Sequence, residues 1–177
     1  AYRREDGEVQ FFRPFENIRR MAASGARVSM PAMDEDMFME ALRRLVEVDK
    51  DWVPHEQGAS LYIRPFMIAT DVGLGVHASD SYLFCILTCP VGNYYPEGIN
   101  PIKILIEDED VRAVRGGTGF AKCGGNYAAS IRASKRAAEQ GFAQVLWLDG
   151  VERKYIEEVG AMNIFFKIRG VLYTTPL

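Results

Sequence analysis

Apolar residues near the start of the chain recur at spacings that predict a hairpin followed by two helices. Asp6-Gly7 is a strong tight-turn signal with Val9 in the strand-forming segment beyond it, so residues 2–12 are expected to form the hairpin. Pro14 suits the first turn of a helix, and Asp34 is a good N-cap for a second helix. The stripes expected to face the core are Ile18, Met21 and Ala22 in the first helix, and Met37, Phe38, Ala41, Leu42 and Leu45 in the second.

The next apolar segments predict two strands joined by a glycine-relieved turn at residues 73–76. Residues 60–68 form the first strand, and within it Tyr62 and Arg64 lie two apart and therefore point the same way. Two polar tips on one face can receive a carboxylate, and they can equally bond each other. Residues 81–90 are a continuous apolar run, which is typical of a strand buried on both faces.

The second half of the chain is predicted to contain mostly strands around one helix. That helix is expected over residues 126–140, with Asn126 as its N-cap and Gly141 as its stop. A strand over residues 102–106 precedes it. Further strands are expected at residues 144–148, 154–160, 162–168 and 171–175.

A stretch rich in Gly, Pro and Asn, residues 92–101, is the best candidate for an interdomain linker. Residues 1–91 are then expected to form a small α/β domain, and residues 102–177 the first part of a larger, mostly β domain. Alternating strands and helices followed mainly by strands indicate the α/β class, of the α+β type, with two unequal lobes.

Composition excludes several classes of protein. The 177 residues are 48% hydrophobic and 25% charged, which is typical of a globular chain and too apolar for a disordered one. The balance of 21 basic against 24 acidic residues argues against a nucleic-acid surface, and no apolar run approaches the roughly 18 residues that span a bilayer. Three cysteines without metal-type pairing to histidine indicate reduced thiols in a cytoplasmic setting.

The glycine-rich segment at residues 116–127 holds the most suggestive chemistry, because five glycines there surround one lysine, Lys122. Such a segment can turn through positive φ and pass close to a ligand. A lysine held in it can be partly desolvated; desolvation lowers a lysine pKa, and a neutral amine attacks a carbonyl to form a Schiff base. A surface turn whose lysine points into water has the same pattern, so the segment alone leaves both interpretations open.

Several arginines are candidate anion ligands. Arg19, Arg20 and Arg27 cluster on the first predicted helix, either as solvated charges or with one of them reaching a phosphate, which the planar guanidinium suits. Arg112 and Arg115 precede the glycine-rich segment and could add positive charge to a phosphate region.

The glycine-rich segment resembles the pyridoxal-phosphate (PLP) lysine loop of the branched-chain aminotransferases, a family of fold-type IV PLP enzymes. The resemblance runs along the whole chain in one order, and it implies the fold of that family. The other matching blocks are Phe12-Arg13-Pro14 with Asn17, Arg20 and Met30-Pro31; residues 47–54 (EVDKDWVP); residues 61–65 (LYIRP); residues 144–148 (QVLWL); and residues 158–163 (EVGAMN).

This resemblance implies PLP as cofactor, joined to Lys122 as a Schiff base, with the same lysine moving a proton during the reaction. Arg20 is the arginine that the family match selects for the cofactor phosphate. Tyr127 matches the phenol that bonds the ring hydroxyl. Glu158 matches the carboxylate at the ring nitrogen, and Glu157 competes with it because neighbouring strand residues face opposite ways.

The reaction implied is transamination of leucine, isoleucine and valine with 2-oxoglutarate as amino acceptor, in a cytoplasmic homodimer. Tyr62 and Arg64 would receive or orient the substrate carboxylate. Leu74 and Val76 would lie on a loop that reaches the partner subunit's substrate pocket. Tyr94 resembles a pocket residue, although an ordinary linker aromatic explains it nearly as well.

Two alternatives remain open at this point. One is another fold-type IV PLP enzyme, a D-amino acid aminotransferase or an aminodeoxychorismate lyase, against which the blocks at residues 52–54 and 61–65 argue. The other is a non-catalytic fragment, because the family is expected to begin before Ala1 and to continue beyond Leu177 with a phosphate-binding turn and a loop that receives the substrate carboxylate.

Overall fold

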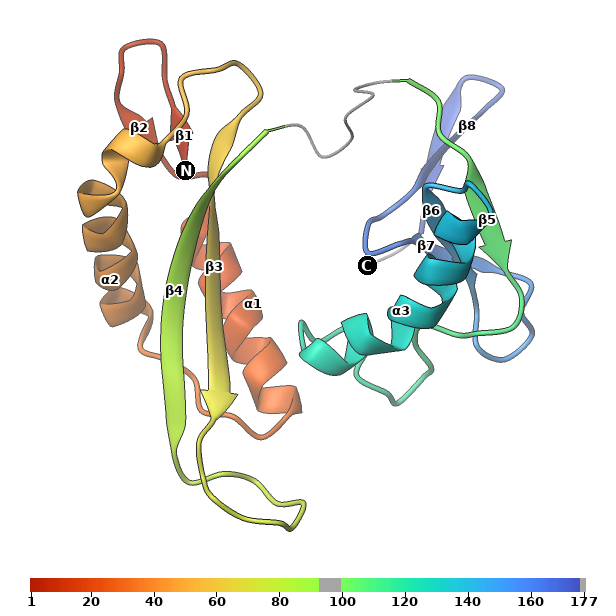
Figure 1. Ribbon diagram of the computed structural model, residues 1–177, viewed down its shortest axis with the longest axis horizontal. Coiled ribbons are helices and arrows are strands. Elements are labelled where there is room, and N and C mark those ends of the chain that lie inside the picture. The colour runs from red at the N-terminus through yellow and green to blue at the C-terminus, as the bar shows by residue number, and fades with distance from the viewer. Residues whose placement is uncertain (93–99, 176–177) are drawn as a thin grey trace. The chain divides into compact units, whose positions relative to one another are not determined.

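A computed structural model describes residues 1–92 and 100–175. The chain divides into two compact units, Ala1–Ile99 and Asn100–Leu177. The division falls inside the stretch predicted to be a linker, residues 92–101. Each unit has its own sheets and its own core (Figure 1).

The first unit consists of a short hairpin, two helices and a long two-stranded ribbon (Figure 1). Both pairs of strands are antiparallel, as the predicted hairpin requires. The elements in chain order are β1 (Tyr2–Arg3), β2 (Val9–Gln10), α1 (Pro14–Arg27), α2 (Glu35–Val48), a 3₁₀ turn η1 (Lys50–Trp52), β3 (Ser60–Ala69) and β4 (Tyr82–Val91).

Both helices of this unit begin where the sequence predicts. Pro14 is the first residue of α1, and the residue before it, Arg13, has φ 47°, a left-handed conformation uncommon in residues other than glycine. Asp34 caps α2: its carboxylate accepts a hydrogen bond of 2.8 Å from the backbone N–H of Met37, which satisfies one of the helix's otherwise unpaired donors.

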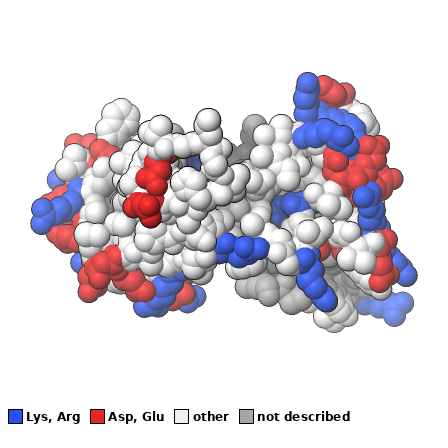
Figure 2. Space-filling view, turned by 90° about the horizontal axis from the view of Figure 1, so that it is seen from below, with Lys and Arg blue, Asp and Glu red and all other residues white. Residues whose placement is uncertain are grey.

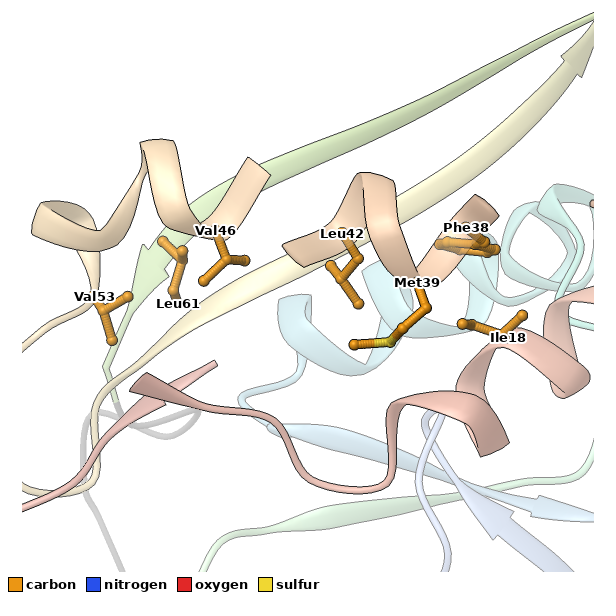
Figure 3. Close-up of a cluster of buried hydrophobic side chains, with 7 residues drawn as sticks. All are labelled: Ile18, Phe38, Met39, Leu42, Val46, Val53 and Leu61. Carbon is orange, nitrogen blue, oxygen red and sulfur yellow. The ribbon is translucent and has the colours of Figure 1, made fainter. Parts of the chain in front are cut away.

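The core of the first unit joins the two helices to the ribbon (Figure 3). Ile18 of α1 belongs to one cluster with four residues of α2 and with Leu61 of β3. The predicted stripe of α2 is wrong at Met37 and Ala41, which are exposed, because the face toward the core carries Met39 and Val46 instead. The ring of Phe38 packs edge-on against Phe84 of β4 at 4.9 Å between ring centres. The buried members are Ile18, Phe38, Met39, Leu42, Val46, Val53 and Leu61.

Among the described residues, only one face of the β3–β4 ribbon is covered. Leu61, Ile63 and Phe84 point toward the helices, whereas Leu83 and Leu87 on the opposite face are 49% and 56% exposed. The prediction that residues 81–90 are buried on both faces is therefore wrong. A continuous apolar run does not reveal which of its two faces has a neighbour within the same unit.

The second unit is built on a three-stranded mixed sheet with one helix and a separate hairpin. β5 and β6 run parallel, and α3 forms the crossover between them; β7 pairs antiparallel with β6. Ala133 and Ala137 of α3 pack on Val145 and Trp147 of β6. The elements are β5 (Ile104–Glu107), α3 (Gly124–Glu139), β6 (Gln144–Leu148), β7 (Ile156–Val159), β8 (Phe165–Ile168) and β9 (Val171–Thr174).

One predicted helix start in this unit is wrong. The N-cap of α3 is Cys123, without a side-chain capping bond, and the helix begins at Gly124. Asn126 lies inside the first turn and is buried. Arg169 and Gly170, which lie between the predicted strands 162–168 and 171–175, join β8 to β9, and both have positive φ, 51° and 83°, as a tight two-residue hairpin turn needs.

The surface carries charges of both signs. On the face shown in Figure 2, basic and acidic side chains are interspersed over each unit. Within residues 1–92 and 100–175, none of the helices is long and apolar enough to cross a bilayer, and no cluster of His, Cys, Asp and Glu suited to a metal ion is found.

Candidate active site

The glycine-rich segment is held in shape by Asn126, which plays a different part from the predicted cap. Its amide donates to the carbonyl oxygens of Thr118 at 2.8 Å and Ala121 at 2.6 Å. Its carbonyl oxygen accepts a 2.8 Å bond from the hydroxyl of Thr118. This buried amide fixes the segment from Thr118 to Ala121, which directly precedes Lys122.

Lys122 and Tyr127 form a pair at the start of α3. The lysine Nζ donates to the tyrosine hydroxyl at 2.6 Å and lies 5.2 Å from the ring centre. Lys122 is exposed and Tyr127 is 41% exposed. The expectation that this amine is desolvated is therefore not met within the described residues: the loop fixes the position of the lysine without burying it.

The five glycines serve different purposes. Gly116 has φ 82°, a backbone conformation that favours glycine. Gly119 allows a close approach, because a Cβ built on it would lie 2.6 Å from the Cβ of Ala113. Gly124 and Gly125, two and three residues after the lysine, have no atom of the described residues within 4 Å of such a Cβ. The fold of this unit gives no steric reason for these two, so the space beside Lys122 is open.

Glu158 on β7 is paired with Arg112. The guanidinium Nη1 lies 2.8 Å from Glu158 Oε2, and the two side chains are 14% and 34% exposed. This contact has the distance of an ion pair without the angles of a hydrogen bond, so Oε2 is a buried oxygen with no hydrogen-bond donor among the described residues. The positive charge predicted for a phosphate region at Arg112 is thus engaged by a carboxylate.

Glu157, the competing carboxylate, has different surroundings. It lies at the register shift between β6 and β7, where its neighbours Ile156 and Glu158 pair with Leu148 and Trp147 and Glu157 itself has no partner on β6. It also lines an open hollow of about 380 Å³ beside the glycine-rich segment. Burial raises the pKa of Glu157, the charges of Asp149 and Glu158 raise it further, and Arg112 opposes them. Glu157 therefore holds its proton more readily than an ordinary glutamate.

A carboxylate that the motifs did not single out is the most deeply buried one described. The side chain of Glu107, at the end of β5, is fully buried and is bound through both oxygens by Arg136 of α3. Backbone N–H groups of Glu109 and Asp110 donate to it at 2.8 Å each. Burial by itself would raise the pKa of Glu107, but these bonds outweigh burial and lower it.

Arg20 lies in the first unit, on α1. Its Nη2 donates to the side-chain oxygen of Asn17 at 2.9 Å, and Asn17 in turn donates to the carbonyl of Arg13 at 3.2 Å. Neighbouring Arg19 instead pairs with carboxylates, those of Glu16 and Glu35. Within the described ranges no carboxylate forms an ion pair with Arg20, which separates it from Arg19 as a candidate anion ligand.

The remaining predicted residues also belong to the first unit. Tyr62 and Arg64 share the outer face of β3, and Arg64 Nη2 donates to the tyrosine hydroxyl at 3.3 Å, so the mutual bond weighed against carboxylate binding is present. Leu74 and Val76 are fully exposed, at 107% and 108%, in the segment between β3 and β4. Tyr94 lies outside the described residues.

A hairpin, a βαβ crossover and a lysine loop ahead of α3 are the features to compare with known protein families. Residues 2–177 match the amino-transferase class IV family, and the chain belongs to that family. The branched-chain amino acid aminotransferase of T.th., solved with pyridoxamine 5'-phosphate, superimposes with a TM-score of 0.78 at 27% identity over 92% of this chain and 52% of its own. The Escherichia coli enzyme gives 0.75 at 27% identity over 98% and 55%. The predicted fold class is confirmed.

Two curated relatives have a higher sequence identity to this chain than these solved structures do. Branched-chain-amino-acid transaminase 1 of Bacillus subtilis (strain 168) is 58% identical over all of this chain and 50% of its own length. Branched-chain-amino-acid aminotransferase 2 of the same organism is 56% identical over all of this chain and 49% of its own. The resemblance seen in the motifs is confirmed, and the chain spans about half the length of these curated relatives.

Proposed function

We propose that the protein is a PLP-dependent aminotransferase that moves the amino group of leucine, isoleucine and valine to 2-oxoglutarate. The observation that carries this proposal is the Lys122–Tyr127 pair, a lysine amine 2.6 Å from a phenol in a loop pinned by Asn126. It occurs in a chain that is 58% identical, over its full length, to a branched-chain transaminase.

The residues of the second unit fit a pyridoxal cofactor. An aldehyde needs an amine with free space around it, and the space beside Lys122 is open at Gly124 and Gly125. A protonated ring nitrogen needs an acceptor, and Glu158 presents a buried oxygen with no hydrogen-bond donor among the described residues. Tyr127 would bond the ring hydroxyl. Arg20, which belongs to the first unit, is proposed as the phosphate ligand on the resemblance alone.

When bound, PLP supplies the electron-withdrawing ring that stabilises negative charge at the substrate Cα. The chain's own groups then move and hold protons. Lys122 Nζ is the proposed base that takes the proton from the substrate Cα and delivers it to the C4′ carbon of the cofactor. Tyr127 holds that amine in place, as its bond to Nζ supports. Glu158 is the proposed partner of the ring-nitrogen proton.

Substrate recognition is proposed for the outer face of β3. Arg64 offers a guanidinium for the substrate carboxylate, and Tyr62 already orients it. An apolar side-chain pocket would discriminate among branched substrates only modestly, because one methylene group is worth about 1–3 kcal/mol. Tyr94 remains a proposed pocket residue on the resemblance alone.

A cytoplasmic homodimer is part of this proposal. Leu74 and Val76 expose their side chains completely, and Leu83 and Leu87 expose an apolar face of the ribbon; large apolar exposure of this kind marks interaction surfaces, and a second copy of the chain is the proposed partner. Sedimentation equilibrium should show a dimer at micromolar concentration. A monomer over the whole accessible range would contradict the dimer.

An amino-donor panel tests the reaction. The protein, incubated with PLP and 2-oxoglutarate, should form glutamate from L-leucine, L-isoleucine and L-valine, and Lys122→Ala should abolish this. Lys135→Ala is the matched control, since Lys135 lies on the exposed side of α3 in a 3.8 Å ion pair with Glu139. Preference for D-alanine, or release of 4-aminobenzoate from aminodeoxychorismate, would replace the proposal by another reaction of the same fold.

A further inference from the structure

The acidic turn after β5, residues 107–110, is held by three arginines from elsewhere in the second unit. Arg136 binds one buried and one exposed carboxylate of the turn. Arg132 donates to the carboxylate at position 110 at 2.9 Å, and Arg153 donates to the backbone carbonyl of residue 109 at 2.7 Å. Charge-assisted bonds are stronger than neutral ones, so this turn has a fixed position relative to α3 and to the β6–β7 connection.

Two residues beyond this fixed turn stands Arg112. Its side chain is only 14% exposed and ends 2.8 Å from Glu158 Oε2 on β7. The proposed function uses Glu158 and assigns nothing to Arg112. A glutamate needs an outside partner for orientation, because its terminal torsion is broad and the carboxylate turns easily. A guanidinium is always charged and planar, which makes it well suited to fix a carboxylate.

We propose that Arg112 is a positioning residue that holds the carboxylate of Glu158 toward the ring nitrogen of the pyridoxal cofactor. This inference rests on the proposed function. Through the turn at residues 107–110, the position of Arg112 is tied to α3, the helix that begins beside Lys122. The base at Lys122 and the acceptor at Glu158 are thereby supported by one framework of ion pairs rather than by two independent segments.

The test measures cofactor binding and the spectrum of the bound cofactor. Arg112→Gln should weaken PLP binding about tenfold or more, the scale seen in metal sites when an outer partner of a ligating group is removed. It should also move the pH midpoint of the cofactor's visible absorption, which a change in fold stability alone would leave in place. Arg112→Lys keeps the positive charge, so its PLP affinity and its pH midpoint should lie between those of Arg112→Gln and those of wild type. Lys135→Gln, which removes an exposed charge from α3, is the control.

A double variant shows whether Arg112 acts through Glu158. In a Glu158→Gln background, adding Arg112→Gln should weaken PLP binding no further, because the carboxylate it holds is gone. Additive losses, or a wild-type midpoint and affinity in Arg112→Gln, would overturn the inference while leaving the proposed function intact. Wild-type protein that takes up no PLP would overturn both. If Arg112→Gln does not fold, Arg112→Lys provides the same comparison with a smaller expected shift.

Discussion

Replacing Glu107 by glutamine tests how much the buried ion pair of the second unit contributes to stability. The variant keeps the shape of the side chain and one acceptor oxygen for the two backbone N–H groups, each at 2.8 Å. It removes the charge that binds Arg136, and it turns an amide donor toward that guanidinium. Bonds to charged groups are worth about 1.5–3 kcal/mol each, and breaking a buried pair costs about 3–5 kcal/mol. Because the backbone bonds survive, the expected loss is about 2–3 kcal/mol.

The assay is urea unfolding followed by the fluorescence of Trp147, which is fully buried in the same unit. A Trp52→Phe background removes the other tryptophan, which is 66% exposed in the first unit. Glu109→Gln is the matched control, because Glu109 pairs with the same arginine while 63% exposed; it should cost less than about 0.5 kcal/mol.

The contribution of Glu107 to stability should decrease as the pH is lowered. The pKa of Glu107 is lowered below its ordinary 4.5 in the folded protein, so its contribution is complete above that value and is lost as pH falls through the folded pKa. The difference between wild type and Glu107→Gln should therefore shrink as the pH is lowered below 4.5. A loss under about 1 kcal/mol at pH 7, or one that stays constant on acidification, would refute the reasoning.

Four other outcomes follow from the structure. Gly119→Ala should destabilise the second unit and reduce PLP uptake, because its Cβ would lie 2.6 Å from that of Ala113. The added Cβ of Gly124→Ala has no atom of the described residues within 4 Å, so this variant should stabilise the apoprotein by about 0.5–1 kcal/mol while lowering PLP affinity. Unchanged PLP affinity in Gly124→Ala would show that the cofactor does not use the open space beside Lys122. Asp34→Ala should cost about 1 kcal/mol in thermal unfolding of the first unit, and no change would argue against the cap. The stability of Glu157→Gln relative to wild type should increase as pH rises through the raised pKa of the wild-type carboxyl, because ionised Glu157 destabilises the folded protein. A difference in stability that does not change with pH would contradict the raised pKa.

Local chemistry was the part of the structure that the sequence predicted well. Turn and cap residues such as Asp6-Gly7, Pro14 and Asp34 act through their nearest neighbours, so their effect can be read from a few positions. The predicted burial of β4 failed for a different reason, since burial depends on which other elements cover a face, and the apolar pattern contains no such information.

In the candidate site, too, contacts between residues close in the sequence could be predicted, whereas contacts between distant segments could not. The pairing of Tyr62 with Arg64 follows from the two-residue period of a strand. The tie from Asn126 back to Thr118 and the ion pair between Arg112 and Glu158 depend on how the loop folds and where β7 lies. The run of acidic residues at 107–110 is evident in the sequence, but Arg136, which binds the buried Glu107, lies 29 residues further along the chain than Glu107.

Mapping of the reduced cofactor adduct tests the central claim most directly. The protein is incubated with PLP, reduced with borohydride, digested and analysed by mass spectrometry. A pyridoxyl group is expected on the peptide that carries Lys122, and none in Lys122→Ala. An adduct mainly on another lysine, such as exposed Lys135, or no adduct at saturating PLP, would contradict it.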